Sequence, residues 1–274
     1  MKHIAKPGPF VPWVGGKTAI LDSLLAIVPE GFETYVEPFV GGGAMFFGMP
    51  KEGRRVINDA NMHLMNAYIQ VKDDVEAVIE ELEKLIAPDS LIAYKELAQK
   101  SVNTPNGPEG AALFIATLKT SWGAKWEIDA KGNHQGGWIG KKRNICDKSK
   151  LRLAANHLKN TEIFSKDYKL VLDGLNLNPR DFVYLDPPYL PENGQEFTSY
   201  TAEGFGEDDH YYLAKWIAKQ TQNDVRVMLS MSDTPRAREI YNGLDFRVAV
   251  APRRLNRHDG VGLDLIGLNY YAPG

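Results

Sequence analysis

The chain has 274 residues, of which 43% are hydrophobic and 24% are charged, and its formal net charge is −3. These values are typical of a globular protein and exclude an obligate polycation, so any contact with nucleic acid must come from a local basic patch. No run of about 18 apolar residues is present, so we expect no membrane span. The single cysteine, Cys146, suggests a reducing compartment, and we expect a cytoplasmic protein.

Strands and helices alternate at both ends of the chain. The predicted elements, in chain order, are a helix near 18–28, strands at 34–38 and 54–58, strands at 161–165 and 181–185, a helix near 207–220, a strand at 225–231, a helix after Thr234 and two antiparallel strands at the end. This alternation predicts an α/β fold: a Rossmann-like doubly wound sheet, mostly parallel, with an antiparallel C-terminal hairpin.

The middle of the chain has a different pattern. Apolar residues recur at helical spacing up to about residue 122, as in Val75, Ile79 and Leu82. A polar, glycine-rich and basic stretch without strong periodicity follows, GAKWEIDAKGNHQGGWIGKKRN. We therefore expect a catalytic domain of residues 1–60 and 161–274, interrupted by a helical and basic insertion of residues 61–160.

The buried strand at 181–185 ends in a rigid turn, Asp186-Pro187-Pro188-Tyr189, which we call the elbow. Two prolines prevent the strand from continuing, and the turn presents a carboxylate, bare carbonyls and one ring. A carboxylate and a carbonyl can accept hydrogen bonds from the two N–H groups of an amino group on a nucleobase. The ring can stack on the base. A plain strand-ending turn is the structural alternative.

A glycine loop, EPFVGGGAMF, follows the first strand. Gly41, Gly42 and Gly43 allow the backbone to turn tightly and to approach a ligand closely. A tight turn that binds no ligand is an equal alternative. Asp59 ends the next strand, where nucleotide-binding sheets place a carboxylate on ribose hydroxyls. Because Phe46 stands where a dinucleotide fingerprint has its third glycine, the pattern favours a single adenosine moiety.

The segment PWVGGKT precedes the first helix and does not form a phosphate-binding P-loop. That motif requires a glycine at position 11, where this chain has Val11. Trp13 and Lys17 would instead supply a ring and a cation that close over a small ligand. Ordinary core packing is the alternative for Trp13.

Taken together, these motifs resemble the Dam-type, or D12 class, family of adenine-N6 DNA methyltransferases. The matching stretches follow the family's order over about residues 10–60 and 180–258, and they are PFVPWVGGKT, VEPFVGGGAMF, INDAN, DPPY, EFTSYTAEGF and LSMSDT. The resemblance implies methyl transfer from S-adenosylmethionine to the N6 amino group of adenine in double-stranded DNA by base flipping, without a metal. It also implies a protein that is a monomer or a weak dimer on DNA.

The resemblance further implies a role for each matching position. The catalytic residues would be Asp186, Pro187, Pro188 and Tyr189. The cofactor would be bound by Trp13, Lys17, Glu37, Phe39, Gly41, Gly43, Asp59, Asp167 and Asp186. The family carries its sequence-reading segment in the insertion. Local basic clusters and nearby rings, rather than matching positions, predict most of the DNA contacts, and a solvated charged face is their alternative. The expected DNA-binding residues are Lys119, Trp122, Lys125, Lys141, Lys142, Arg143, Phe197, Tyr200, Arg253, Arg254 and Arg257.

Other interpretations stay open at this point. The amino group of cytosine N4 would suit the same elbow, as would a glutamine amide in a protein, although enzymes of the latter kind carry Asn in place of Asp186. A non-catalytic DNA-binding module that retains the fold is a third possibility. Asp259 and Asp264 stand where well-known family members are basic, so we infer no GATC specificity. The six histidines show no metal-ligand pattern, and we expect His210 at the surface of its helix.

Overall fold

The computed structural model describes residues 7–190, 204–253 and 260–272, with the backbone alone for residues 250–253 and 260–263. The chain forms two compact units. The first unit consists of Met1–Gly16, Val40–Lys51 and Asp59–Ser165, and the second consists of Lys17–Phe39, Glu52–Asn58 and Lys166–Gly274. The glycine loop therefore belongs to the same unit as the helical middle of the chain. The predicted domain boundaries near residues 60 and 160 stay a prediction.

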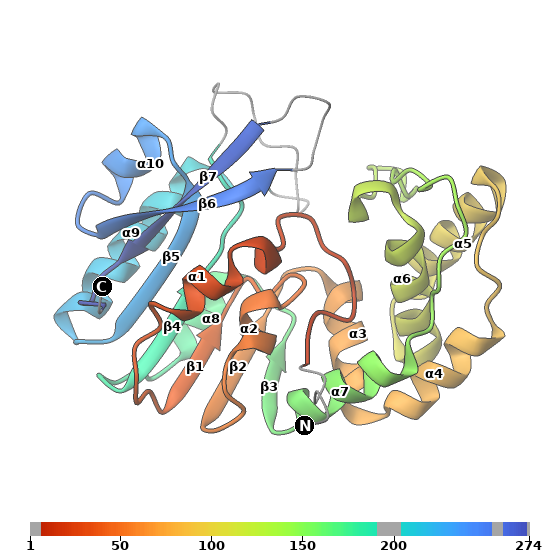
Figure 1. Cartoon of the computed structure of the whole chain (residues 1–274), viewed down its shortest axis with the longest axis horizontal. Helices are drawn as coiled ribbons and strands as arrows, with labels where there is room; N and C mark the ends of the chain where they lie inside the picture. Colours follow the sequence, from red (N-terminus) through yellow and green to blue (C-terminus); the bar gives the residue numbers. More distant parts are fainter. Residues whose placement is uncertain (1–6, 191–203, 254–259, 273–274) are drawn as a thin grey trace. The chain divides into compact units, whose positions relative to one another are not determined.

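Over the part of the chain that the structure describes, seven strands form one sheet in the order β3-β2-β1-β4-β5-β7-β6 (Figure 1). Their bounds are β1 Thr34–Glu37, β2 Arg54–Asn58, β3 Thr161–Phe164, β4 Asp181–Leu185, β5 Arg226–Ser232, β6 Asp245–Arg253 and β7 Gly260–Leu268. β1 runs parallel to β2 and β4, and β4 runs parallel to β5, whereas β7 is antiparallel to both β5 and β6. This arrangement confirms the predicted α/β sheet with its antiparallel C-terminal hairpin.

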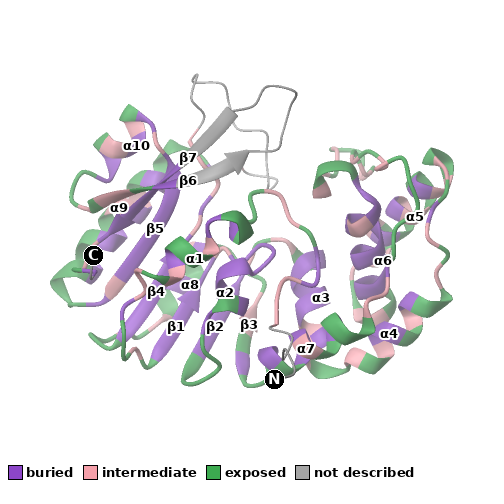
Figure 2. Cartoon of the chain, viewed as in Figure 1, coloured by how far each residue is buried: buried purple, intermediate pink, exposed green. Residues whose placement is uncertain are grey.

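The central strands are buried along their whole length (Figure 2). Every residue of β1 and β4 is buried, as expected for parallel strands that are covered on both faces. Tyr35 of β1 and Phe182 of β4 pack with their ring centroids 5.8 Å apart. Because β1 pairs with β2 on one side and with β4 on the other, the strand order reverses at β1 and β4. Ligands of such sheets bind at the carboxyl ends of the strands beside this switch point.

The helical segments of the second unit, within its described residues, are the 3₁₀ turn η1 Lys17–Ala19, α1 Leu21–Leu25, α8 Tyr168–Gly174, α9 Glu207–Gln222 and α10 Pro235–Ile240. α9 packs on β5 and α10. As predicted, Thr234 caps α10, because its Oγ1 accepts a hydrogen bond from Ala237 N at 3.1 Å and Pro235 occupies the first turn. The helix expected at 18–28 is shorter, since Ile20 offers no capping side chain and Pro29 disfavours helical backbone at Val28.

The helical segments of the first unit, within its described residues, are α2 Ala44–Gly48, α3 Met62–Asp73, α4 Val75–Lys84, α5 Leu91–Asn103, α6 Gly107–Thr120, the 3₁₀ turn η2 Trp122–Ala124 and α7 Lys148–Leu158. In this unit, α3, α4 and α5 pack on one central helix, α6. The apolar sequence of α6 is buried on all sides from Gly110 to Leu118. Asn61, Asp74 and Ser90 cap α3, α4 and α5 through their side chains.

Residues 121–139, which we call the hairpin segment, follow α6. Two isolated antiparallel bridges join Ser121 to Trp138 and Ile128 to His134. Trp126 is buried, and its ring centroid lies 4.7 Å from that of Phe114 in α6 and 5.0 Å from that of His134. A cluster of rings therefore anchors this segment, which explains why its sequence shows neither helical nor strand periodicity.

His210 of α9 lies in the interior, so its predicted surface position is wrong. Its side chain is 1% exposed, and its Nδ1 lies 2.8 Å from the Tyr241 hydroxyl. The ring also hydrogen-bonds the backbone of Pro188 in the elbow and packs edge-on against Phe205 at 5.0 Å. Burial lowers the pKa of His210 to about 4, although the Pro188 bond opposes this shift. A neutral histidine thus ties the elbow to α9 and α10.

This burial predicts a specific pH dependence of stability. Because the folded-state pKa of His210 lies below that of the unfolded chain, the unfolded state binds more protons between about pH 6.5 and pH 4. We expect His210→Gln to lower the free energy of unfolding by about 1 kcal/mol at pH 7.5, and the difference from wild type to shrink towards pH 5. Thermal unfolding of both proteins across this range measures the effect. A difference that stays constant or widens on acidification would contradict the buried neutral ring.

Candidate active site

The elbow holds a buried ion pair. Lys17 Nζ lies 2.7 Å from Asp186 Oδ2, and the two side chains are only 8% and 18% exposed. Lys17 Nζ also lies 4.9 Å from the centre of the Tyr189 ring, and the Tyr189 hydroxyl lies 3.5 Å from Ser230 Oγ of β5. Pro187 is buried within the turn. The structure thus brings the predicted Lys17, Asp186 and Tyr189 together at the carboxyl end of β4.

Charges around the elbow are strongly coupled. Burial raises the pKa of Asp186 above its ordinary value, the Lys17 ammonium opposes this rise, and the carboxylate of Asp264 on β7 adds to it. Burial acts to lower the pKa of Lys17, but Asp186 and Tyr189 outweigh it, so the net shift is upward. Lys17 therefore stays a cation. Burial, reinforced by Asp186, raises the pKa of Tyr189, whose hydroxyl stays protonated.

Glu37 ends β1 beside the elbow strand. It is buried, and its Oε2 accepts a hydrogen bond from the Tyr35 hydroxyl at 2.7 Å. Burial and the Glu37 carboxylate both raise the pKa of Tyr35, so this hydroxyl remains a donor. The sequence analysis did not identify Tyr35 as a supporting residue. The available signal is the two-residue spacing, which puts both side chains on the same face of a strand.

The glycine loop and Asp59 form a second group of predicted residues, within the first unit. Gly41 N donates to Asp59 Oδ2 at 3.1 Å, and Asn61 N donates to Asp59 Oδ1 at 2.9 Å. Gly41 has a φ of +47°, and a Cβ there would lie 2.7 Å from the Trp13 ring. Gly43 has a φ of +73°, and a Cβ there would lie 2.5 Å from the Tyr68 hydroxyl. Both positions therefore require glycine, for backbone and for space.

The Asp59 carboxylate is half-buried at the end of β2. Burial raises its pKa to about 6, and the two backbone N–H donors oppose the rise. Among the described residues, each oxygen accepts one backbone hydrogen bond, so each has a further lone pair for a hydroxyl donor. A carboxylate of this kind can bind a vicinal diol.

Asn58, which the sequence analysis did not single out, links two loops of the second unit. Its Nδ2 donates to the backbone oxygens of Pro38 and Lys166, both at 3.0 Å, and its Oδ1 accepts from Lys166 N at 2.9 Å. The neighbouring Asp167 is exposed and caps α8 by accepting from Lys169 N at 2.7 Å. The rings of Phe39 and Tyr168 pack at a tilt of 39° with their centroids 5.0 Å apart.

The predicted DNA-binding residues fall into three groups. Lys119, Trp122, Lys125, Lys141, Lys142 and Arg143 lie in the first unit, and all but the half-buried Lys119 are exposed. Trp122 is 59% exposed, and Lys125 pairs with Glu127. Phe197, Tyr200, Arg254 and Arg257 lie outside the described residues, and the structure gives only the backbone of Arg253.

Neither a metal-binding cluster nor a membrane-spanning helix is found in the described parts of the chain. Residues 7–190, 204–253 and 260–272 contain no cluster of three or more His, Cys, Asp or Glu side chains able to hold a metal ion. Over those same residues, every helix is too short or too polar to cross a membrane.

Comparison with known proteins assigns the chain to a family. Residues 13–254 match the family of D12 class N6 adenine-specific DNA methyltransferases. The chain is 33% identical to the type II methyltransferase M1.LlaDCHI of Lactococcus lactis subsp. cremoris over 89% of this chain and 88% of that protein. It is 32% identical to the type II methyltransferase M.MjaIII of Methanocaldococcus jannaschii, over 96% and 99% of the two chains. It is 26% identical to the DNA adenine methylase of Haemophilus influenzae, over 94% and 91%.

These matches confirm the predicted family and favour adenine N6 over cytosine N4 as the methyl acceptor. They cover both the elbow and the glycine loop. The chain belongs to the D12 class of N6 adenine-specific DNA methyltransferases and is an adenine-specific DNA methyltransferase.

Proposed function

We propose that this enzyme uses S-adenosylmethionine as the methyl donor and acts on an adenine rotated out of duplex DNA, with Asp186, Pro187 and Tyr189 of the elbow as its catalytic residues. The observation that carries this proposal is the ion-paired Asp186 beside the Tyr189 ring at the carboxyl end of β4. A fixed carboxylate next to an aromatic ring suits an amino-bearing base, which presents N–H donors and a flat face.

The chemistry of the predicted cofactor residues fits this donor. Asp59 has lone pairs for the ribose hydroxyls, and Gly41 and Gly43 leave space that any side chain would fill. Glu37 supplies a carboxylate for the amino group of the methionine part. Phe39 supplies a ring for the adenine part. We propose the same donor-binding role for Trp13, Lys17 and Asp167. The proposed reaction uses no metal ion.

S-adenosylmethionine, when bound, supplies a methyl group made electrophilic by a positively charged sulfur. In the proposed mechanism, Asp186 and the Pro187 carbonyl accept hydrogen bonds from the two N–H groups of the target amino group. These bonds draw the nitrogen away from conjugation with the adenine ring. As this nitrogen bonds the methyl carbon, the bond from that carbon to the donor sulfur breaks and its electron pair stays on the sulfur. The Asp186 carboxylate stabilises the positive charge that develops on the nitrogen. Tyr189 stacks on the base, and the methylated amino group finally loses one proton to solvent.

Asp186 must be ionised for this role. Lys17 favours the ionised form against burial and the Asp264 charge. Lys17 also fixes the side chain through the bond to Oδ2, so the carboxylate is oriented before the base arrives. Rotating a base out of the duplex costs roughly a few kcal/mol, which binding of the DNA backbone must offset. We propose that residues 61–160 form the target-recognition insertion that provides this binding.

Removing the Asp186 carboxylate tests the catalytic assignment. We expect Asp186→Ala to lower kcat by about 10³-fold or more, because it deletes the group that stabilises the developing charge. Steady-state methylation of duplex DNA measures the loss, and circular dichroism checks the fold. Ser232→Ala, at the end of the neighbouring strand β5, serves as a control. Near-normal turnover of a folded Asp186→Ala protein would contradict the assignment.

The ion pair predicts a shift in the pH–rate profile. Lys17→Met removes the charge that lowers the pKa of Asp186, so the acid limb of kcat should move to higher pH by about one unit or more. Lys17→Arg, which keeps the charge, should shift the limb much less. The measurement is kcat at saturating substrates between pH 5 and 9. Superimposable limbs for wild type and Lys17→Met would disprove a role for Lys17 in keeping Asp186 ionised.

Asp59 predicts a pH dependence of donor binding that needs no DNA. Its carboxylate accepts hydrogen bonds best when ionised, so donor affinity should be constant above about pH 6 and fall below it. We expect Asp59→Asn to weaken binding about tenfold at pH 7.5 and to abolish this pH dependence. Calorimetric titration with S-adenosylmethionine measures both effects. Wild-type affinity that does not change between pH 5 and 7.5 would exclude Asp59 from the donor site.

A further inference from the structure

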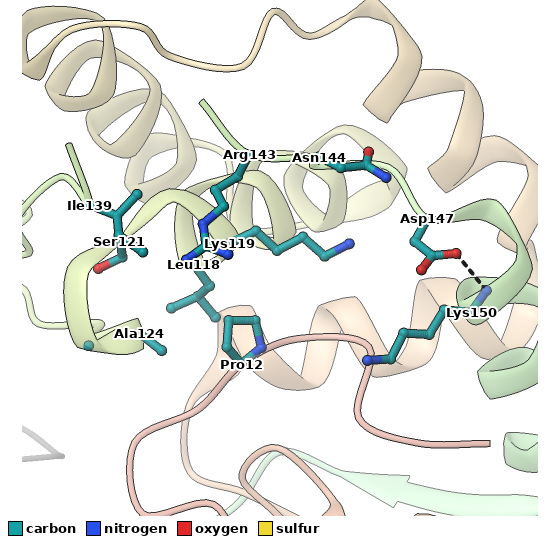
Figure 3. A pocket seen from close by; sticks show the side chains of 11 residues that line it. Pro12, Leu118, Lys119, Ser121, Ala124, Ile139, Arg143, Asn144, Asp147 and Lys150 are labelled. Carbon is teal, nitrogen blue, oxygen red and sulfur yellow. Dashed lines mark hydrogen bonds between the residues drawn. The ribbon is translucent and has the colours of Figure 1, made fainter. Parts of the chain in front are cut away.

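A cavity of about 450 Å³ lies within the first unit, away from the elbow in sequence (Figure 3). The end of α6 and the start of α7 form part of its wall, and Pro12 provides an apolar side. Lys119 extends into it from α6 and Lys150 from α7, and Arg143 lines it from the segment between these helices (Figure 3). Ser121 and Asn144 add polar groups to the lining.

Among the described residues, the lining carries three cations, Lys119, Arg143 and Lys150, and one acid. The acid, Asp147, caps α7: its Oδ1 accepts from Lys150 N at 3.1 Å and from Ser149 Oγ at 2.8 Å. Within the described part of the chain, Lys119, Arg143 and Lys150 form no ion pair with a carboxylate, and Lys119 Nζ donates to the backbone oxygen of Ile145 at 3.1 Å. The cavity is therefore positive and rich in unused donors.

The charged form of Lys119 is destabilised by its position in the cavity. Burial lowers its pKa, Asp147 opposes the shift, and the nearby Lys150 charge adds to it. Two cations that repel each other at a partly buried site are stabilised by an anion that binds between them. The anion that suits Lys, Arg, Ser and amide donors together is a phosphate group.

We propose that this cavity binds one backbone phosphate of the DNA substrate, with Lys119, Arg143 and Lys150 as its ligands. The inference rests on the proposed DNA-binding role of the insertion, and it adds Lys150 and a defined site to that role. Position in the chain supports DNA over a free anion: the hairpin segment leaves from Ser121 at the cavity and returns to Ile139, which also lines it. A phosphate held here fixes the backbone next to the exposed Trp122 and Lys125 of the hairpin segment. The contact is independent of sequence.

The test compares two lysines of one helix. Lys150→Met removes a cavity cation, whereas Lys148→Met removes the same charge from α7 at a residue that pairs with Glu83 at 2.6 Å and does not line the cavity. Duplex binding is measured for both variants and wild type over a range of salt concentrations. We expect Lys150→Met to reduce the slope of log affinity against log salt by about 0.9, as for one lost phosphate contact, and Lys148→Met to leave it unchanged.

A second experiment identifies the phosphate. Duplexes that carry a single neutral methylphosphonate at successive positions are bound to wild type and to Lys150→Met. One position should weaken wild-type binding about tenfold and have little further effect on Lys150→Met. Equal salt slopes for the two variants, or methylphosphonate effects that simply add to the Lys150→Met effect at every position, would overturn the proposal. Inorganic phosphate that binds wild type without either DNA effect would show a free-anion site and overturn it equally.

The outcomes separate this inference from the proposed function. If the wild-type enzyme methylates adenine with S-adenosylmethionine but Lys150→Met and Lys148→Met have equal salt slopes, only the phosphate site is disproved and the proposed function stands. Wild-type enzyme that neither binds duplex DNA in a salt-dependent way nor methylates it would defeat both.

Discussion

The buried ion pair between Lys17 and Asp186 is the interaction on which the proposed catalytic site depends. Removing two charges from water is costly, and such a pair contributes little to stability compared with apolar residues of similar size. Its value here is chemical. In the proposed mechanism, it favours the ionised form of the carboxylate against burial and the like charge of Asp264, and it holds the side chain in one orientation at the end of a buried strand. Prolines on one side and the neutral His210 on the other leave the elbow little freedom to move.

Chain connectivity relates this site to the second group of predicted residues. β1 ends at Glu37, and four residues later the chain reaches Gly41. β2 ends at Asn58, and Asp59 is the next residue. The carboxyl ends of neighbouring parallel strands therefore lead directly into the glycine loop and its carboxylate partner, which is the general pattern for ligand sites in sheets of this kind. The hydrogen bond from Gly41 to Asp59 ties these two connections together.

Much of this could be predicted from the sequence, because several features depend on neighbours in the chain. Alternating strands and helices gave the sheet, and glycines at positive φ and prolines after a strand marked the loop and the elbow. Features that depend on residues distant in the chain could not be predicted.

His210 resembles a surface residue because acidic and polar residues surround it in sequence, whereas its burial comes from contacts with Tyr241 and Phe205. Likewise, Trp126 lacks any strand pattern, since its anchor is Phe114 of another element. The sequence around Lys150 is that of an ordinary exposed helical lysine, because the cavity that it shares with residues of α6 depends on the tertiary structure.

The most direct test of the central claim is methyl transfer from labelled S-adenosylmethionine to unmethylated duplex DNA, followed by nucleoside analysis of the product. An elbow that polarises the amino group of a flipped adenine predicts label in N6-methyladenine alone. Label in N4-methylcytosine, or no incorporation by an enzyme that binds the donor, would contradict the account.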